Sequence, residues 1–290
     1  MNRSTNTGTL FRKQKRYLAG RILALLLLFC LSPFSRVFYS MAVMGIYSKM
    51  NERTSLLHTE GIELSIPGGL TTLRSDWYPF VMTFEANSGF RRFTGNSSLD
   101  LTILYNFPAF SPTKGCSRLY DTASPYYNSF YGAYLVKDED GGAYGFTRRN
   151  DGSFYPDASA VAEVPKYDFW QLVLSEFGLT RSNAVFDWNI TDISKPLSYA
   201  GEDGFYRMDA TLTVNGSSHE YNGFTQSYLQ YGKPNFPVTN PLTPVPMYGR
   251  LYGKYLEDKQ VSLFFYIVAA DKEVLEDCDR ELLSKSALAY

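Results

Sequence analysis

Few side chains in this 290-residue sequence have the types and spacing that acid–base or nucleophilic chemistry requires. The chain has two histidines, His58 and His219. His219 could activate a serine in a Ser-His-Asp triad, but the sequence has no Gly-x-Ser-x-Gly motif or other nucleophile signature. We therefore interpret His219 as an exposed histidine at the end of a strand, and we assign no catalytic residue.

Metal and nucleotide sites are equally poorly supported. Asp138, Glu139 and Asp140 precede two glycines and offer carboxylate oxygens to calcium, but the EF-hand spacing and its distal glutamate are missing. A solvated hairpin tip explains these acids better. The His-Glu-x-x-His, P-loop and Gly-x-Gly-x-x-Gly motifs are also absent. We predict neither a metal nor a cofactor.

Carboxylate pairs leave one enzymatic alternative open. The chain has 29 acidic residues, and two of them could flank a glycosidic bond at a separation of roughly 5 to 9 Å that only the fold determines. An extracytoplasmic hydrolase of this kind is our alternative hypothesis.

Aromatic residues are the most prominent feature of the composition. They make up 16% of the chain, with 23 Tyr, 21 Phe and three Trp. Amphipathic rings bind proteins and sugars well, so we predict an exposed contact patch at Trp77, Tyr78, Tyr248 and Tyr252. The competing explanation is that these rings favour strands and fill the faces of a sheet.

Two cysteines of the body form one candidate disulfide, Cys116–Cys278. The bridge would close a loop of some 160 residues and add about 5 kcal/mol of stability by chain entropy. The alternative is a pair of unrelated thiols. No Cys-x-x-Cys is present, which argues against a zinc ribbon or a thioredoxin-type site.

The N-terminal region has the charge and hydropathy of a membrane leader. Residues 1–46 carry seven basic groups and no acidic one. The apolar run 22–31 is only long enough for the core of a signal peptide, whereas 22–46 reaches membrane-spanning length. Its thirteen Leu, Ile, Val and Phe residues favour insertion by roughly 4 to 8 kcal/mol, against about 3 for Arg36.

We therefore predict a basic cytoplasmic leader at 1–21 and a single-pass signal anchor at 22–46, with the body outside the cytoplasm because the cations are retained inside. The alternative is secretion after signal cleavage. Residues 47–290 hold 21 basic and 29 acidic groups. This net charge of −8 disfavours nucleic acid as a partner, because phosphate binding needs clustered positive charge.

The body begins with a polar spacer at 47–60. After it, apolar residues recur at every second position, as in strands. Residues 62–66 alternate apolar and polar side chains and end at a Pro-Gly-Gly turn. Residues 80–86 and 99–107 are expected to pair as an antiparallel hairpin, and 126–136 forms a further strand. Asp-Gly and Asn-Gly pairs, which suit tight hairpin turns, recur at 140–141, 151–152, 203–204, 215–216 and 222–223.

Two helices and a hairpin complete the predicted fold. One helix is expected at about 165–177, where Pro165 suits the first helical position, and another at about 271–286. A hairpin at 248–255 and 260–269 precedes the second helix. Five prolines make 232–247 an extended strap. We predict an α+β domain over 61–290, mainly antiparallel sheet with two packed helices, preceded by the membrane helix.

The two ends of the body carry a family resemblance. A strand running into Ser65-Ile66-Pro67-Gly68-Gly69-Leu70, together with an apolar strand at 261–268 that enters a final helix, resembles PsbP/Mog1-like domains. The resemblance covers about 50 residues at these ends and implies a non-catalytic, membrane-associated accessory domain.

These patterns together favour binding over catalysis. Our functional hypothesis is a membrane-anchored extracytoplasmic binding or accessory domain without catalytic activity of its own. We expect it to contact the membrane through its N-terminal helix, and its partner to be an envelope protein or a glycan.

Overall fold

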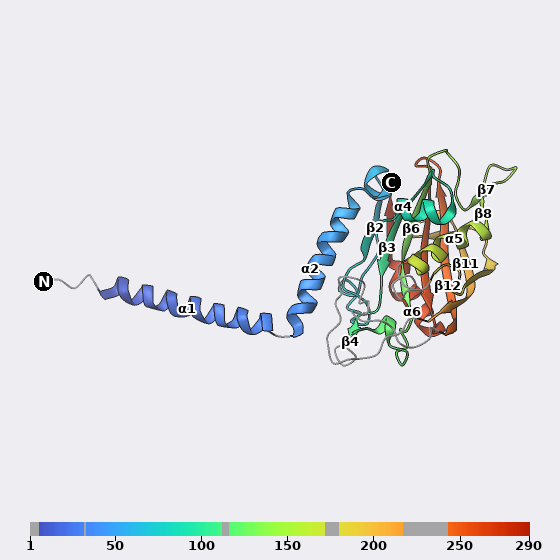
Figure 1. The fold of residues 1–290 in the computed structure, drawn as a ribbon. Helices are drawn as coiled ribbons and strands as arrows, with labels where there is room; N and C mark the ends of the chain where they lie inside the picture. Colours follow the sequence, from blue (N-terminus) through green and yellow to red (C-terminus); the bar gives the residue numbers. More distant parts are fainter. Residues whose placement is uncertain (1–5, 32, 112–115, 172–179, 217–242) are drawn as a thin grey trace.

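One antiparallel sheet organises the body of the protein (Figure 1). The computed structural model describes residues 6–31, 33–111, 116–171, 180–216 and 243–290. The sheet follows the order β10-β11-β12-β13-β6-β3-β2, and β9 also pairs with β11. Its strands are β2 (Met82–Glu85), β3 (Leu99–Asn106), β6 (Phe130–Asp138), β9 (Phe186–Ile193), β10 (Leu197–Tyr199), β11 (Glu202–Asn215), β12 (Pro244–Leu256) and β13 (Val261–Ala269). The predicted α+β class with a mainly antiparallel sheet is confirmed.

Shorter strands and helices surround this sheet. The strands pair as β1 (Glu63–Ser65) with β14 (Ala287–Ala289), β4 (Phe110–Ser111) with β5 (Cys116–Ser117), and β7 (Phe146–Arg148) with β8 (Phe154–Pro156). The helices are α1 (Asn6–Leu31), α2 (Pro33–Glu52), α3 (Leu56–Thr59), α4 (Asn87–Thr94), α5 (Ala158–Phe169) and α6 (Lys272–Glu281).

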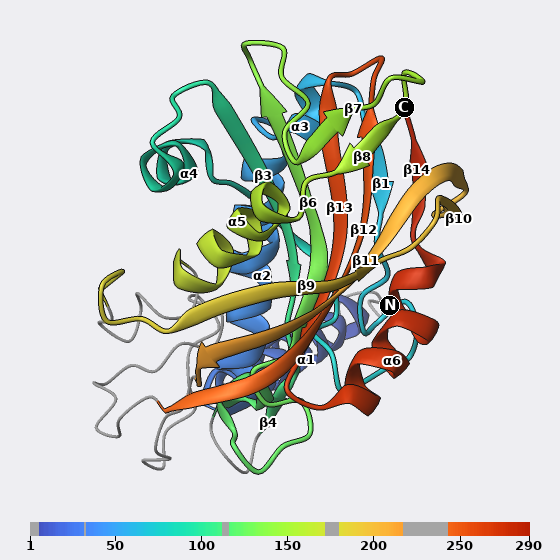
Figure 2. The same cartoon turned by 90° about the vertical axis from the view of Figure 1, so that its right-hand side faces the viewer.

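The sheet carries a core on each face because its central strands are apolar on both sides. In β13, Phe264, Tyr266 and Val268 enter one cluster with α4 and α5, whereas the residues between them enter a second cluster with α3, β1, β14 and α6. Figure 2 shows these elements on opposite sides of the sheet. The long apolar run of β13 thus follows from burial on both faces.

Both predicted strand pairs are present. β12 and β13 form the expected hairpin, and β2 pairs antiparallel with β3. The connection between β2 and β3 holds α4, whose Phe90 is fully buried. The Asp151-Gly152 turn joins β7 and β8 as predicted. Gly204 instead lies inside β11, and the preceding turn is made by Ala200 and Gly201, both at positive φ.

The predicted proline strap overlaps β12. Residues 232–242 lie outside the described part of the chain, but Pro244 and Pro246 belong to β12 and lie opposite residues of β11. β13 pairs with β12 only from Tyr248 onward. A strand tolerates proline where the missing N–H would face an unpaired edge. Both prolines lie on the part of β12 that pairs with β11 but has no partner on the β13 side.

The two predicted helices exist with different bounds. Asp157 caps α5 by accepting N–H bonds from Ser159 and Ala160, so this helix begins well before Pro165, which lies inside it. The helix was predicted to run to residue 177, but 172–179 lie outside the described residues. α6 begins at its Asp271 cap as expected, then gives way to a 3-10 turn and β14 before residue 286.

The N-terminal segment forms two helices where one membrane helix was predicted over 22–46. α1 ends at Leu31 and α2 begins at Pro33, and proline is favoured at the first position of a helix, which separates the two. Within the described residues, neither of these helices nor any other meets the length and apolarity needed to cross a membrane. The predicted spacer at 47–60 instead packs on the sheet through α2 and α3.

Candidate binding groove

The predicted aromatic contact patch is not formed. The side chains of Trp77, Tyr78 and Tyr252 are 2%, 1% and 6% exposed, and only Tyr248, at 40%, reaches solvent freely. Trp77 packs edge-on against the Tyr131 ring at 4.9 Å, while Tyr78 belongs to the cluster on the other face of the sheet.

Tyr252 has a structural role that explains its burial. Its ring stacks on Tyr199 with centroids 3.8 Å apart, and its hydroxyl donates to Asp279 at 2.7 Å. Burial and the neighbouring carboxylate raise the pKa of the Tyr252 phenol. At these positions the aromatic residues fill the faces of the sheet, as the competing explanation held.

The predicted Cys116–Cys278 disulfide is not formed in the structure. Cys278 is a free thiol in α6, 1% exposed, and burial raises its pKa well above the usual range. The side chain of Cys116 lies outside the described part of the structure, although its backbone forms β5 with Ser117.

Neither His58 nor the acidic residues 138–140 form part of a metal site in the described part of the chain. His219 lies outside the described residues, and His58 lies exposed on α3. Asp138 accepts hydrogen bonds from Ser98 Oγ at 2.6 Å and from the Asp140 N–H at 3.1 Å. Within the described residues no three His, Cys, Asp or Glu side chains are placed to hold a metal.

Three carboxylates converge elsewhere, around a cation. Arg250 of β12 bonds Asp209 at 2.6 Å and both Glu276 and Asp279 of α6 at 2.8 Å. Its guanidinium lowers the pKa of Glu276. This shared arginine fastens α6 to the sheet, and the three acids serve as its ion-pair partners.

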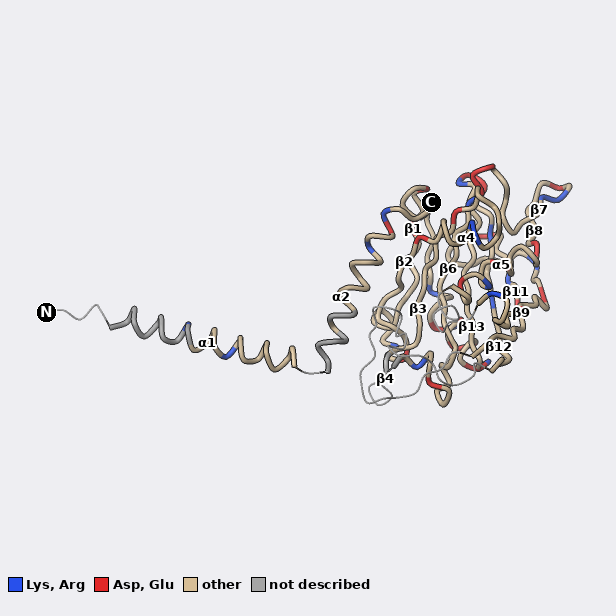
Figure 3. Tube along the Cα trace, viewed as in Figure 1, with Lys and Arg blue, Asp and Glu red and all other residues tan. Residues whose placement is uncertain are grey.

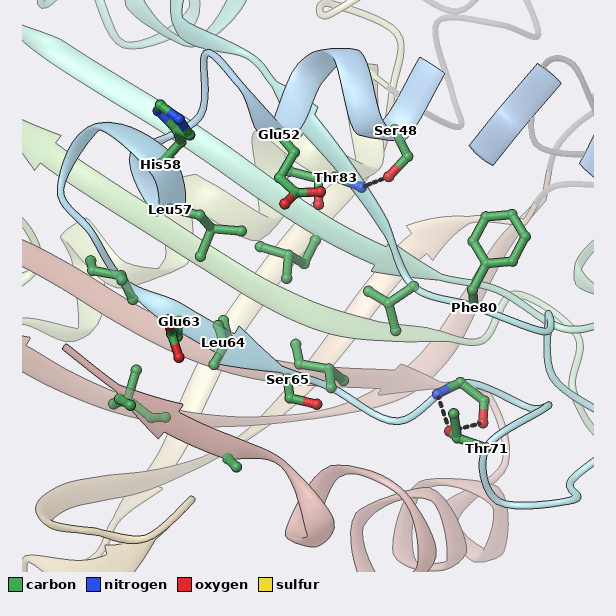
Figure 4. A pocket seen from close by; sticks show the side chains of 18 of the residues that line it. Ser48, Glu52, Leu57, His58, Glu63, Leu64, Ser65, Thr71, Phe80 and Thr83 are labelled. Atoms are coloured by element: carbon green, nitrogen blue, oxygen red, sulfur yellow. Dashed lines mark hydrogen bonds between the residues drawn. The ribbon is translucent and has the colours of Figure 1, made fainter. Parts of the chain in front are cut away.

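The candidate site is a groove with a volume of about 810 Å³ between α2, α3, β1 and β2. Figure 4 shows Ser48 and Glu52 of α2 on one side and Glu63, Leu64 and Ser65 of β1 on the other. Its polar groups come from α2, α3, β1, Thr71 and Thr83 of β2. Apolar surface is contributed by Leu57, Leu64, Ile66, Phe80, Val81, Leu104 and Leu288. A groove of this volume and mixed lining is typical of ligand sites.

One wall of the groove is fixed by hydrogen bonds from α2 to the edge of the sheet. Ser48 Oγ accepts the Thr83 N–H at 2.8 Å, and Asn51 Oδ1 accepts the Glu85 N–H at 3.2 Å. These two amides project from the outer edge of β2, which pairs only with β3 in the described structure. Side-chain acceptors on α2 therefore replace a neighbouring strand.

The opposite wall is positioned by the turn that follows β1. A Cβ on Gly68 would lie 2.5 Å from Pro79 O, so only glycine fits this close approach. The amide of Gly69 donates to Tyr78 O, and Tyr131 Oη donates to Pro67 O at 2.7 Å. The predicted Pro-Gly-Gly turn is thus confirmed, and it holds β1 above the sheet.

The exposed carboxylate of Glu63 gives the rim of the groove a local negative charge. Glu63 is exposed on β1, and Glu52 forms an ion pair with Lys49 at 2.6 Å while its side chain stays 41% exposed. His58 completes the rim at the α3 end (Figure 4). Sequence patterns located β1 and its turn, but gave no sign that β1 and β14, from opposite ends of the body, would pair and leave this groove beside them.

No family model, curated protein or solved structure matches this chain, so the resemblance to PsbP/Mog1-like domains gains no support from these comparisons.

Proposed function

We propose that this protein is a membrane-anchored binding domain without catalytic activity of its own, and that the groove beside β1 is its binding site. The body lies outside the cytoplasm in this proposal, and the basic N-terminus remains inside. The open groove is the observation that carries the binding role, since it combines apolar surface, polar backbone and rim charges in one place.

Support for the membrane anchor comes from the surface of α1. Several of its large apolar side chains are exposed: the exposed fractions include 66% for Leu25, 65% for Leu28 and 83% for Leu31. A contiguous apolar surface of this kind marks a contact with lipid or protein. Figure 3 shows Lys and Arg but no Asp or Glu along α1, the charge balance that retains a leader in the cytoplasm.

The charge and fold of the body support a protein partner more than a glycan. Three of the four aromatic residues of the predicted contact patch are buried and offer no ring on which a sugar could stack. The groove instead presents a strand edge with carboxylates on its rim, which suits a polypeptide.

Cysteine labelling in intact cells tests the location of the body. Ser65 is exposed on β1, so a Ser65→Cys variant of the full chain should react with a membrane-impermeant maleimide before lysis. The matched control is a Ser4→Cys variant, which should react only after lysis. Labelling of Ser65→Cys only after lysis would place the body in the cytoplasm and overturn the proposal.

Site-specific crosslinking in the same membranes tests the binding role. A photoreactive residue in place of Glu63 should capture a partner, whereas one in place of the exposed Asn150, at the tip of the β7–β8 hairpin, should not. Equal products from both positions, or none from Glu63, would argue against the groove as the binding site.

A further inference from the structure

The edge of β1 that faces the groove has an unusual backbone arrangement. β1 pairs antiparallel with β14, and Leu64 lies opposite Leu288. The Leu288 N–H does not turn toward β1, because it donates to Ala200 O at 3.1 Å. In an antiparallel pair, opposite residues alternate between those that exchange both hydrogen bonds and those that exchange none. Leu64 and Leu288 are therefore a pair that exchanges none.

The N–H and C=O of Leu64 consequently point away from β14 and toward the groove. Two residues earlier, the Ile62 N–H faces the same side and donates to Leu57 O of α3 at 2.8 Å. Leu57 thus closes the start of this edge. The backbone groups of Leu64 have no protein partner among the described residues, and an unpaired strand edge is a template for another strand.

The walls of the groove suit the side chains of an added strand. Successive side chains of a strand point to opposite faces. One set would contact the apolar surface that Val81 and Leu104 provide, and the other would face solvent beside the carboxylates of Glu52 and Glu63. Lysine or arginine at the solvent-facing positions would complement this charge.

We propose that the groove binds an extended segment of a partner protein, with alternating apolar and basic residues, by adding it as a strand to β1 at Leu64. This inference rests on the proposed binding role of the groove and names its ligand class. The edge of β2 is unavailable for such pairing because Ser48 and Asn51 already cap its amides. β1 is recessed beside α2 and α3, so a single extended segment can reach it more readily than the flat face of a second copy of this chain can.

A proline substitution separates strand addition from other modes of binding. Leu64→Pro removes the N–H that faces the groove but none that β14 uses, and an edge strand tolerates proline at such a position. Leu64→Ala shortens the side chain but keeps the N–H, which makes it the matched control. Both variants are compared as full chains in detergent micelles, with circular dichroism and unfolding midpoints as folding checks.

The probe is a short fluorescent peptide of alternating lysine and valine, with binding read by fluorescence anisotropy. We expect Leu64→Pro to weaken binding by about tenfold relative to Leu64→Ala, because a main-chain hydrogen bond is lost and its acceptor is left unpaired. N-methylation of alternate peptide amides should weaken binding comparably. A glutamate–valine peptide should bind more weakly, and Glu63→Gln should reduce that difference.

Equal affinity of Leu64→Pro and Leu64→Ala, with no effect of N-methylation, would overturn strand addition while leaving side-chain binding in the groove intact. Absence of binding by both peptides would also overturn it. In either case, crosslinking from Glu63 still decides the proposed function separately. If Leu64→Pro fails to fold, the N-methylated peptide on the unaltered chain gives the same test.

Discussion

At the scale of single residues, Asp168 has a carboxyl group that is buried away from water, where its charged form is destabilised. It lies fully buried in α5, accepts a hydrogen bond from Tyr134 Oη at 2.7 Å, and has no partner for its Oδ1 atom among the described residues. The Tyr266 ring stacks on Tyr134 at 4.0 Å and completes an apolar, aromatic surrounding. Desolvation raises the pKa of Asp168 from 3.8 to about 7.

This raised pKa sets a direction for the pH dependence of stability. The folded protein holds the Asp168 proton more tightly than the unfolded chain does. The free energy of unfolding should therefore fall as the pH rises from about 4 to about 7, and this contribution should be level above pH 7. Asp168→Asn removes the titration while keeping an acceptor for Tyr134. We expect the variant to be more stable than the parent at pH 8, by about 4 kcal/mol at most.

Urea unfolding of both proteins at pH 5 and pH 8 measures this difference. Asp157→Asn is a suitable control, because Asp157 is a helix cap whose pKa is lowered by its hydrogen bonds to Ser159 and Ala160. Asp157 stabilises the folded state when it is ionised. This stabilisation is lost only as the pH falls below about 4, toward the lowered pKa of Asp157 in the folded protein. If Asp168→Asn shows the same difference between pH 5 and pH 8 as the parent, Asp168 does not titrate as the structure indicates.

Arg250 is the second residue whose removal should be costly. It is 9% exposed and bridges Asp209 of β11 to Glu276 and Asp279 of α6. Arg250→Met would leave Glu276 and Asp279 close together without this cation, while Asp209 would keep its ion pair with Arg207 at 3.2 Å. We expect a loss of about 3 kcal/mol in the free energy of unfolding, since breaking a buried ion pair on one side leaves uncompensated charge.

The replacement Arg250→Lys provides the comparison. Lysine keeps the charge but not the planar fork that bonds several carboxylates at once, so it should recover only part of the stability. A lower pH should narrow the gap between Arg250→Met and the parent, because protonated acids no longer repel one another. Full recovery by lysine would show that charge alone, and not geometry, accounts for the role of Arg250.

At the scale of elements, α2 replaces a missing neighbour of β2. Ser48 and Asn51 accept the outward amides of Thr83 and Glu85. We expect the double variant Ser48→Ala, Asn51→Ala to lose about 1 to 2 kcal/mol, because two amides at the sheet edge lose their acceptors. Hydrogen exchange should accelerate at the Thr83 and Glu85 amides.

Amides of the central strand β13 supply the internal control for that experiment. They lie between two strands and should exchange at the parental rate in the double variant. Uniform acceleration across β2 and β13 would mean that the substitutions destabilise the whole protein, and that α2 has no local protective role.

Elements with a local signal were predictable from the sequence, whereas their partners were not. The hairpin of β12 and β13 follows from two strand-forming runs with a short connection, and the Pro67-Gly68-Gly69 turn from its composition. The start of α5 was missed because Pro165 also suits a first helical position, although Asp157 followed by Ser159 carried the signal of a cap. The buried positions of Trp77 and Tyr252 depend on contacts between distant segments, which no local pattern encodes.

At the scale of the whole molecule, the proposed function combines two features: the exposed apolar surface of α1 and the groove beside β1. α2 connects them, since it follows α1 and its last turns form a wall of the groove. A partner bound at β1 would therefore be held close to the membrane surface. The proposed anchor would therefore position the binding site as well as the chain.

The anchor can be tested by a single charge in α1. Leu26 is 54% exposed, and replacing it by aspartate changes its contribution to insertion from about −0.5 to about +3.5 kcal/mol. This change of about 4 kcal/mol is comparable with the whole net gain of insertion expected from the sequence for segment 22–46, after the cost of Arg36. We expect Leu26→Asp to shift the full-length protein from the membrane fraction to the soluble fraction. The parent and a Leu26→Ile control should remain with the membrane after an alkaline carbonate wash. If carbonate strips the parent protein itself, or if Leu26→Asp remains in the pellet as completely as Leu26→Ile, then α1 does not anchor the chain in lipid.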